Sequence, residues 1–477
     1  MLYFRVSLRI QQEPHKNCHI LSASTNPLNG NNPAIIVNNA YLLPHCELNV
    51  TGFFFRLWYW FCEIKIIYMN ALNIIALLVT MAALFSYVNY RYIQLPTVIG
   101  IMLIALMMSL VFIGVNQLGW QDFYSPTEKL LRSINFHDAL MNGMLSFLLF
   151  AGALHVNIND LAKQKGIITL LATVGVVFTT FIVGGLSWLI FHAFNIDIPL
   201  IYCLLFGALI APTDPIAVMA ILKSAGTPKT LETKIAGESL FNDGIAVVVF
   251  VALLAVATGA EASTASVSLL FVQEAIGGAV YGFVIGYAAF YLLKSVNNYQ
   301  VEALLTLALV MGGYALAQTL HISGPIAMVV AGLLIGNHGR QLAMGEESRK
   351  RLDDFWELID EVLNAVLFVL IGLEVIILAF KTEYILIALA VIPMILGVRY
   401  ISVLLPVKLL HKFRDFSPRV VEIMTWGGLR GGISIALALS LPISDARESI
   451  LAVTYLVVAF SILVQGLSIE RFITGRS

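Results

Sequence analysis

One short polar segment interrupts a part of the chain that is otherwise apolar. It contains four polar side chains close together: Glu238, Ser239, Asn242 and Asp243. At 100° per residue, Ser239 and Asp243 share one face of a helix. Glu238 and Asn242 share the neighbouring face. An ionised acid at the centre of a bilayer costs about 2.5–3.5 kcal/mol on insertion scales, so it needs a partner, a cation or a proton. The segment therefore favours chemistry in which a proton and a cation compete for the oxygens of Asp243.

Two further segments place a charge among residues that break helices. Residues 211–215 read Ala-Pro-Thr-Asp-Pro, and residues 427–432 read Gly-Gly-Leu-Arg-Gly-Gly. Each proline removes a backbone donor and disfavours helical geometry in the residue before it. Non-helical backbone at membrane depth is tolerated only inside protein or beside a water-filled cavity. We therefore expect two interrupted helices in the protein interior.

The charges of these segments suit the ends of broken helices. Such a helix presents about half a positive charge at its N-terminus and half a negative charge at its C-terminus. We expect Asp214 to neutralise the positive ends and Arg430 the negative ends, both as structural partners. A small, hard cation prefers oxygen ligands. We therefore expect Na⁺ (or Li⁺ or K⁺) to be bound by Asp243, Ser239 and the segment around Thr213.

The elements that position these residues are membrane helices. Of the 477 residues, 59% are hydrophobic and 12% are charged, whereas a soluble domain carries about 25% charged residues. The mean hydropathy is +0.87. The net charge of −1 argues against a nucleic-acid partner, which requires a basic surface. The four cysteines show no metal-type spacing, and we expect no cofactor.

The hydropathy pattern predicts an all-α, polytopic protein with about thirteen transmembrane helices in one membrane domain, residues 69–477. A bilayer core about 30 Å thick takes about 20 apolar residues per helix. The expected spans are 71–88, 95–115, 138–156, 167–195, 199–222, 235–257, 268–293, 301–319, 322–336, 355–380, 384–407, 420–441 and 449–468.

The sequence predicts the side of the membrane for the C-terminus and sets residues 1–68 apart from the membrane domain. Loops after odd-numbered spans and the C-terminal tail contain 17 Lys and Arg residues, and the other loops contain 4. Lys and Arg accumulate in cytoplasmic loops, so we expect a cytoplasmic C-terminus. Residues 1–68 lack the regular span pattern. We expect them to be a disordered tail or an extension ahead of a natural start at Met69.

The two interruptions occupy the fifth and twelfth spans, so they lie seven spans apart. An odd offset makes the two halves inverted repeats, and paired interruptions indicate the midplane site of a secondary transporter. An ion channel or uniporter is the first alternative, but it needs a continuous polar pathway. An intramembrane aspartyl protease is the second, and it needs two acids that share a proton. We favour the transporter because the charges gather at one level around the breaks.

From about Asn70 to Arg471 the chain resembles the monovalent cation:proton antiporters of the NhaP and Na⁺/H⁺ exchanger type. The residues that carry the resemblance are 148–155, 211–215, 237–243, 355–361 and 427–432. Together these segments are highly specific. The resemblance implies a secondary active transporter, not an enzyme, in the bacterial inner membrane, with a role in pH and cation homeostasis. It also implies a homodimer in which one bundle moves against a static one.

The same resemblance assigns roles to individual residues. The Asn242–Asp243 pair implies electroneutral exchange of one cation for one proton, with Asp243 as the alternating carrier. Asn242 holds the geometry of the site by hydrogen bonds. In the family, the acid at Glu238 pairs with an arginine of the eleventh span, which matches Arg399. Arg399 is otherwise an unpaired charge within an apolar span, so the electrostatics agree.

Other polar residues have more than one interpretation. Asp360 and Glu361 belong either to a cation funnel or to a solvated helix start. The roles of His155 and Glu374 stay open.

Overall fold

A computed structural model describes residues 71–117, 136–224, 227–259, 264–339, 345–378, 381–411, 416 and 419–474. They all belong to one compact unit, Arg56–Ser477. The expectation for residues 1–68 lies outside the described residues and stays a prediction.

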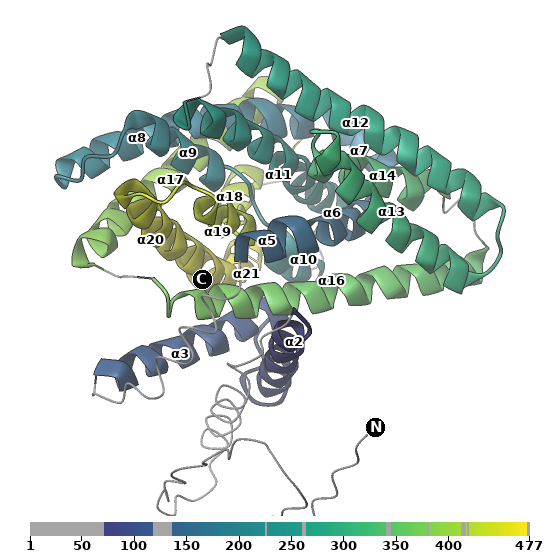
Figure 1. Ribbon diagram of the computed structural model, residues 1–477, viewed down its shortest axis with the longest axis horizontal. Coiled ribbons are helices and arrows are strands. Elements are labelled where there is room, and N and C mark those ends of the chain that lie inside the picture. The colour runs from purple at the N-terminus through teal and green to yellow at the C-terminus, as the bar shows by residue number, and fades with distance from the viewer. Residues whose placement is uncertain are drawn as a thin grey trace, which may run out of the picture. The chain divides into compact units, whose positions relative to one another are not determined.

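Every regular element of the described residues is helical (Figure 1). The α-helices are α2 (Ala71–Val88), α3 (Thr97–Gln117), α5 (Phe136–Asp138), α6 (Leu145–Leu154), α7 (Ile158–Leu170), α8 (Val176–Ala193), α9 (Leu200–Ile210), α10 (Ile216–Ser224), α11 (Lys229–Ala257), α12 (Thr264–Lys294), α13 (Tyr299–Thr319), α14 (Gly324–Leu334), α16 (Glu346–Glu374), α17 (Thr382–Leu410), α18 (Val420–Trp426), α19 (Gly432–Leu439), α20 (Asp445–Phe460) and α21 (Gly466–Thr474). Short π-helical segments join or extend some of them: Asn89–Ile93, Ala139–Met144, Leu171–Gly175, Ile335–Gly339 and Ser461–Gln465.

Within the described residues, 9 helices are long and apolar enough to cross a membrane. Two more apolar helices, Leu200–Ile210 and Gly324–Asn337, are shorter. The other expected spans include the broken twelfth helix and α16, whose first half is rich in charged residues. The prediction of a polytopic helical membrane protein is confirmed, whereas the number of thirteen spans stays a prediction.

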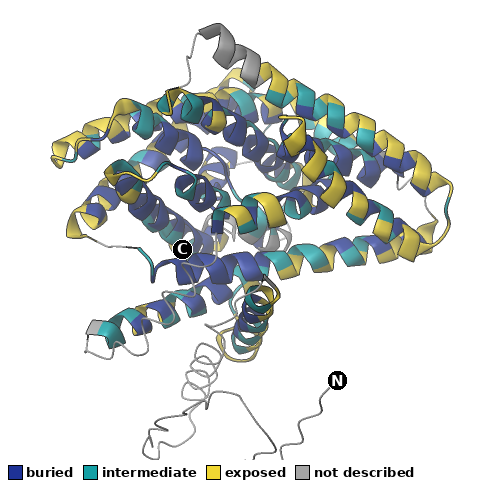
Figure 2. Cartoon of the chain, viewed as in Figure 1, coloured by how far each residue is buried: buried dark blue, intermediate teal, exposed yellow. Residues whose placement is uncertain are grey.

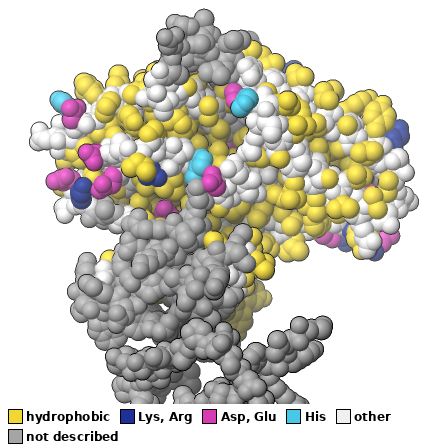
Figure 3. Space-filling model, viewed as in Figure 1, with side chains coloured by type: hydrophobic (Ala, Val, Ile, Leu, Met, Phe, Trp, Pro, Cys, Tyr) yellow, Lys and Arg dark blue, Asp and Glu magenta, His cyan; other side chains and the backbone are white. Residues whose placement is uncertain are grey.

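The outer surface of the bundle is apolar, as a lipid-facing surface must be. Exposed residues line the outer faces of the peripheral helices (Figure 2), and hydrophobic side chains cover much of the visible face (Figure 3). On α12, for example, Val280, Phe283 and Val284 are all exposed. Charged residues are sparse on this surface because an ionised side chain in contact with lipid is costly.

Two buried apolar clusters hold α11 between them. One cluster joins α8, α9, α17 and α20, and the other joins α6, α12, α13, α14 and α16. Side chains of α11 belong to both clusters: Val247 and Phe250 to the first, Leu240 to the second. Gly207 permits the close approach of α9 to α8, because a Cβ there would overlap the Thr180 backbone. The helix that carries the polar segment is therefore packed on both sides.

Both expected interruptions are present, and they cross each other. The chain is not helical between α9 and α10, nor between α18 and α19. Asp214 and Leu429 form an isolated antiparallel bridge, in which the Asp214 N–H donates to the Leu429 carbonyl at 2.7 Å. The prediction of two discontinuous crossing helices, one in each inverted half, is confirmed.

Candidate functional site

Asp214 lies at the start of two helices. Its Oδ1 accepts a hydrogen bond from the Ile216 N–H at 2.9 Å, in the first turn of α10. Its carboxyl group also lies against Gly431, where a Cβ would overlap it. Gly431 directly precedes α19, so one carboxylate serves the N-terminal ends of both α10 and α19. A negative charge is favourable at this end of a helix.

Arg430 makes the complementary contacts from the other break. Its Nη1 donates to the carbonyls of Ala211 and Pro212, each at 2.9 Å. These carbonyls follow the last residue of α9, where the helix dipole is negative. The backbone N–H of Arg430 donates to Ser461 Oγ at 2.9 Å. The guanidinium group thus satisfies acceptors that the broken helix leaves free.

Glu238 and Arg399 form an ion pair with little access to solvent. Arg399 Nη1 donates to Glu238 Oε1 at 2.5 Å, and Nη2 donates to Oε2 at 2.9 Å. The two residues are only 2% and 6% exposed. Arg399 Nη2 also donates to the Met424 carbonyl at 3.3 Å, which ties α17 to α18. Two parallel hydrogen bonds give such a pair a fixed geometry as well as charge compensation.

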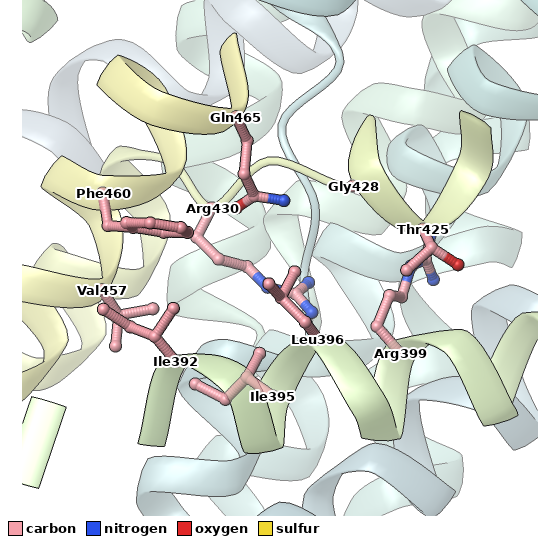
Figure 4. Close-up of a pocket in the computed structure, with 10 residues that line it drawn as sticks. All are labelled: Ile392, Ile395, Leu396, Arg399, Thr425, Gly428, Arg430, Val457, Phe460 and Gln465. Carbon is pink, nitrogen blue, oxygen red and sulfur yellow. The ribbon is translucent and has the colours of Figure 1, made fainter. Parts of the chain in front are cut away.

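A small cavity of ≈ 10 Å³ separates Arg399 from Arg430. Side chains from α17, α18, the second break and α20 surround it (Figure 4). Arg399 Nε and Thr425 Oγ1 make no hydrogen bond with the described residues. About this volume holds one water molecule. Both arginines therefore line a space in which a water molecule can be the hydrogen-bond partner of Arg399 Nε and Thr425 Oγ1.

The neighbouring polar residues of α11 are tied to the first break. Asn242 Nδ2 donates to Thr213 Oγ1 at 2.9 Å, and the Thr213 N–H donates to Asn242 Oδ1 at 3.4 Å. Thr213 Oγ1 also lies 3.0 Å from Ser239 Oγ. All three residues are buried. They form a rigid group of oxygen atoms where α11 meets the broken helix.

Asp243 differs from these residues because its carboxylate has no partner among the residues that the structure describes. It is 9% exposed, yet no described residue makes a hydrogen bond or an ion pair with it. Asp243 instead lies in the wall of a cavity. Asp214 lines the same cavity, and its charge acts on Asp243. An anion in this position favours any cation that enters.

The cavity has a volume of ≈ 1020 Å³ and a strongly acidic wall. Residues of α2, α3, α6, α7, α10, α11, α16 and α19 line it. Among the described residues in its wall, Lys229 is the only Lys or Arg. The acidic residues of the wall are Asp160, Asp214, Glu232, Asp243, Glu357, Asp360 and Glu361. Such a cleft concentrates cations near its surface.

The structure thus brings together Thr213, Ser239, Asn242 and Asp243, and separately pairs Glu238 with Arg399. Two outcomes concern residues whose roles were open. Asp360 and Glu361 belong to the cavity wall, as does His155. Glu374 is buried at the end of α16 beside Tyr455 and does not line this cavity.

Sequence reasoning missed Asn364 and Ser434, which also line the cavity. Asn364 follows Asp360 by four residues on the same helix. That spacing places both side chains on one face and was the available signal. Ser434 had no such signal in the sequence, because a serine after a glycine-rich break does not by itself indicate a binding site.

Comparisons with known proteins agree on one family. Residues 76–475 match the family described as "Sodium/hydrogen exchanger, transmembrane". The chain is 52% identical over 403 residues to the Na⁺/H⁺ antiporter NhaP of Pseudomonas aeruginosa. This match covers 83% of this chain and 95% of that relative. It is 33% identical over 415 residues to the Na⁺/H⁺ antiporter NhaH of Halobacillus aidingensis, across 85% of this chain and 97% of the relative.

A solved structure shares the fold at low sequence identity. It is the sodium proton antiporter MjNhaP1 from Methanocaldococcus jannaschii at pH 8, with a TM-score of 0.65 and 17% identity. The match covers 84% of this chain and 96% of that chain.

Proposed function

The chain belongs to the sodium/hydrogen exchanger family, and from this premise we propose that it exchanges one Na⁺ for one H⁺ by alternating access, with Asp243 as the carrier. Family membership confirms the prediction of a transporter rather than an enzyme. Exchange of Na⁺ for H⁺ follows from the relatives that are named for this activity. The stoichiometry and the assignment of residues are our proposal.

One observation carries the assignment: Asp243 is a buried carboxylate in the wall of a large cavity, and no described residue forms a hydrogen bond or an ion pair with it. A buried carboxylate is stable only with a proton, a cation or a partner. Since no described residue serves as that partner, a proton and a cation alternate in this role. Each displaces the other because both bind the same oxygens.

The bound cation takes its remaining ligands from the group beside Asp243. Ser239 Oγ and Thr213 Oγ1 lie 3.0 Å apart, and Asn242 holds Thr213 in position through two hydrogen bonds. These are hard, neutral oxygen atoms, which suit Na⁺, Li⁺ or K⁺. Among the described residues, no group of three or more His, Cys, Asp and Glu side chains is arranged to hold a metal ion, which fits a singly charged substrate.

The fixed charges around Asp243 support our proposal of electroneutral exchange. Arg399 compensates Glu238, and Asp214 serves two helix N-termini. In this proposal Asp243 is the acid beside the crossing that exchanges a proton for Na⁺. Replacing its proton with Na⁺ alters no net charge at the site, so one cation moves for each proton.

The cavity opens towards the cytoplasm in this proposal. Its wall includes Asp160, Lys229 and Glu357, which lie on or next to loops that the distribution of Lys and Arg predicts to be cytoplasmic. The same argument supports a cytoplasmic C-terminus, and the family supports a location in the bacterial inner membrane. The negative wall attracts Na⁺ from that side.

The wider assembly is also part of the proposal. Residues 69–477 form the transport domain and include the family match at 76–475. We further expect two copies to form a homodimer within the lipid bilayer, so that one bundle of each copy moves against a static dimer interface.

The decisive experiment is dissipation of a pH gradient in proteoliposomes that contain the full chain, with Na⁺, Li⁺ and K⁺ added separately. We expect a stronger response to Na⁺ than to K⁺, and no dependence on an imposed voltage. Asp243→Asn should abolish exchange, because an amide cannot alternate between a proton and a cation. Asp354→Asn makes the same chemical change at an exposed position outside the cavity wall, and it should exchange normally.

Two results would contradict this proposal. Substantial exchange by Asp243→Asn would remove that residue from the mechanism. A rate that follows the imposed voltage would exclude the one-to-one stoichiometry, even if Asp243 were essential.

A further inference from the structure

Asp360 and Asn364 lie one turn apart on α16, and both line the large cavity. Asn364 is only 2% exposed, and because it follows Asp360 by four residues, both side chains lie on one face of α16. Its Oδ1 accepts no hydrogen bond from any described residue. Asn364 therefore contributes to the acidic cavity wall a buried amide oxygen that has no hydrogen-bond donor among the described residues.

Ser434 adds a second oxygen of the same kind from α19. It is 1% exposed, its Oγ makes no hydrogen bond with the described residues, and it lines the same cavity. The helices α16 and α19 pack against each other. Leaving a buried polar atom unsatisfied costs about 1–3 kcal/mol. Two residues with such atoms line one cavity together with Asp360, and each unsatisfied atom calls for an explanation such as a bound ligand.

We propose that Asp360, Asn364 and Ser434 bind a second monovalent cation, which waits in the cavity before it reaches Asp243. The proposal rests on the exchange function assigned above and adds a binding site to it. The ligands are one carboxylate and two neutral oxygens, so a singly charged, hard cation such as Na⁺ fits them. Asp360 and Asn364 lie on one face of α16, so both can bind the same ion.

The site also has an electrostatic connection to the crossing. The charge of Asp214 acts on Asp360 and on Asp243. A cation at Asp360 therefore relieves repulsion among the three acids, and a second cation at Asp243 repels the first. Several weak sites in sequence allow an ion to enter and to leave. The cavity wall thus provides a defined cation-binding site on the way to Asp243, in addition to its overall negative charge.

A binding measurement separates the two sites. Radioactive Na⁺ would be titrated onto the purified full chain carrying Asp243→Asn, which removes the carrier carboxylate. We expect saturable binding to persist in this variant. Adding Asp360→Asn should weaken that binding about tenfold, because loss of a charged ligand costs roughly 1.4 kcal/mol. Adding Asp354→Asn instead should leave it unchanged.

Exchange kinetics provide the second measurement. Asp360→Asn in an otherwise native chain should raise the apparent KM for Na⁺ about tenfold and leave the maximal rate close to normal. Asn364→Ala and Ser434→Ala keep the charge and should raise the KM by smaller factors. They also test the site if Asp360→Asn does not fold, which size-exclusion chromatography would detect.

The outcomes distinguish this inference from the exchange function. If Asp243→Asn binds no Na⁺, or if Asp360→Asn changes neither binding nor KM, the second site is refuted while exchange through Asp243 stands. An equal KM change in Asp354→Asn would assign the effect to general charge and also refute the site. Exchange by Asp243→Asn would instead refute the function itself.

Discussion

Glu238 and Asp243 are two carboxylates of α11 that lie five residues apart in the sequence. They differ in whether the protein supplies a positive partner. Glu238 is 2% exposed and Asp243 is 9% exposed, so both are removed from bulk water. Glu238 accepts two hydrogen bonds from Arg399, whereas Asp243 accepts none from the described residues. Burial alone therefore does not distinguish a structural acid from a functional one. The difference lies in the source of the compensating positive charge. The protein supplies it for Glu238, whereas in our proposal a proton or a cation from solution supplies it for Asp243.

The helix itself produces this difference. Five residues correspond to a rotation of about 140° on an α-helix. One carboxylate therefore faces Arg399 of α17, and the other faces the cavity. Because α11 packs against apolar clusters on both sides, it cannot rotate to exchange these environments. The same element thus carries a permanent ion pair and an exchangeable site.

The largest effect should come from breaking the permanent pair. Glu238→Gln leaves the buried guanidinium of Arg399 without its counter-charge, which should lower the free energy of unfolding by roughly 3–5 kcal/mol. The double variant Glu238→Gln/Arg399→Met should recover much of this loss, since both charges are gone. Thermal unfolding of the detergent-purified chain, followed by size-exclusion chromatography, measures the change.

Asp243→Asn is the matched control for that experiment, because it removes the acid of the same helix that has no ion-pair partner among the described residues. We expect its unfolding temperature to equal or exceed that of the native chain. If Glu238→Gln is as stable as the native chain, or Asp243→Asn loses as much stability, the distinction between the two acids is wrong.

A second test uses pH to count the exchangeable acids. A proton on Asp243 excludes Na⁺, so the apparent KM for Na⁺ should rise as the pH falls. When a single proton competes, the rise approaches about tenfold per pH unit at the acidic end, by linkage of the two ligands. Initial exchange rates in proteoliposomes at a series of Na⁺ concentrations and pH values give this slope. A limiting slope that corresponds to two protons would mean that a second acid titrates together with Asp243. That result would contradict the assignment of Asp243 as the single exchangeable acid.

The smallest of these effects concerns the group that positions the ligands. Asn242→Ala removes both hydrogen bonds to Thr213, and kcat/KM for Na⁺ should fall about tenfold, which corresponds to roughly 1.4 kcal/mol. Asn142→Ala, at an exposed position, is the control and should exchange normally. Unchanged kinetics in Asn242→Ala would show that Thr213 needs no support from α11.

Much of the architecture follows from local sequence. Apolar runs determine the membrane class, because only helices with internal backbone hydrogen bonds are stable in lipid. The prolines around Asp214 and the glycines around Arg430 determine where two helices break. The spacing of Ser239 and Asp243 determines that they share a face, since this depends only on helical geometry.

Other features depend on residues that are distant in the sequence. Glu238 and Arg399 are 161 positions apart, and their pairing could be expected only from a family resemblance and from an otherwise isolated charge. No local pattern predicts that Asp243 lacks a partner among the described residues, or that the face of α16 with Asp360 and Asn364 borders the same cavity as Asp243. Composition and local geometry determined that this protein crosses the membrane and where its helices break. Tertiary packing alone decided which buried charges are compensated, because the electrostatic energy of an acid depends on its neighbours in space.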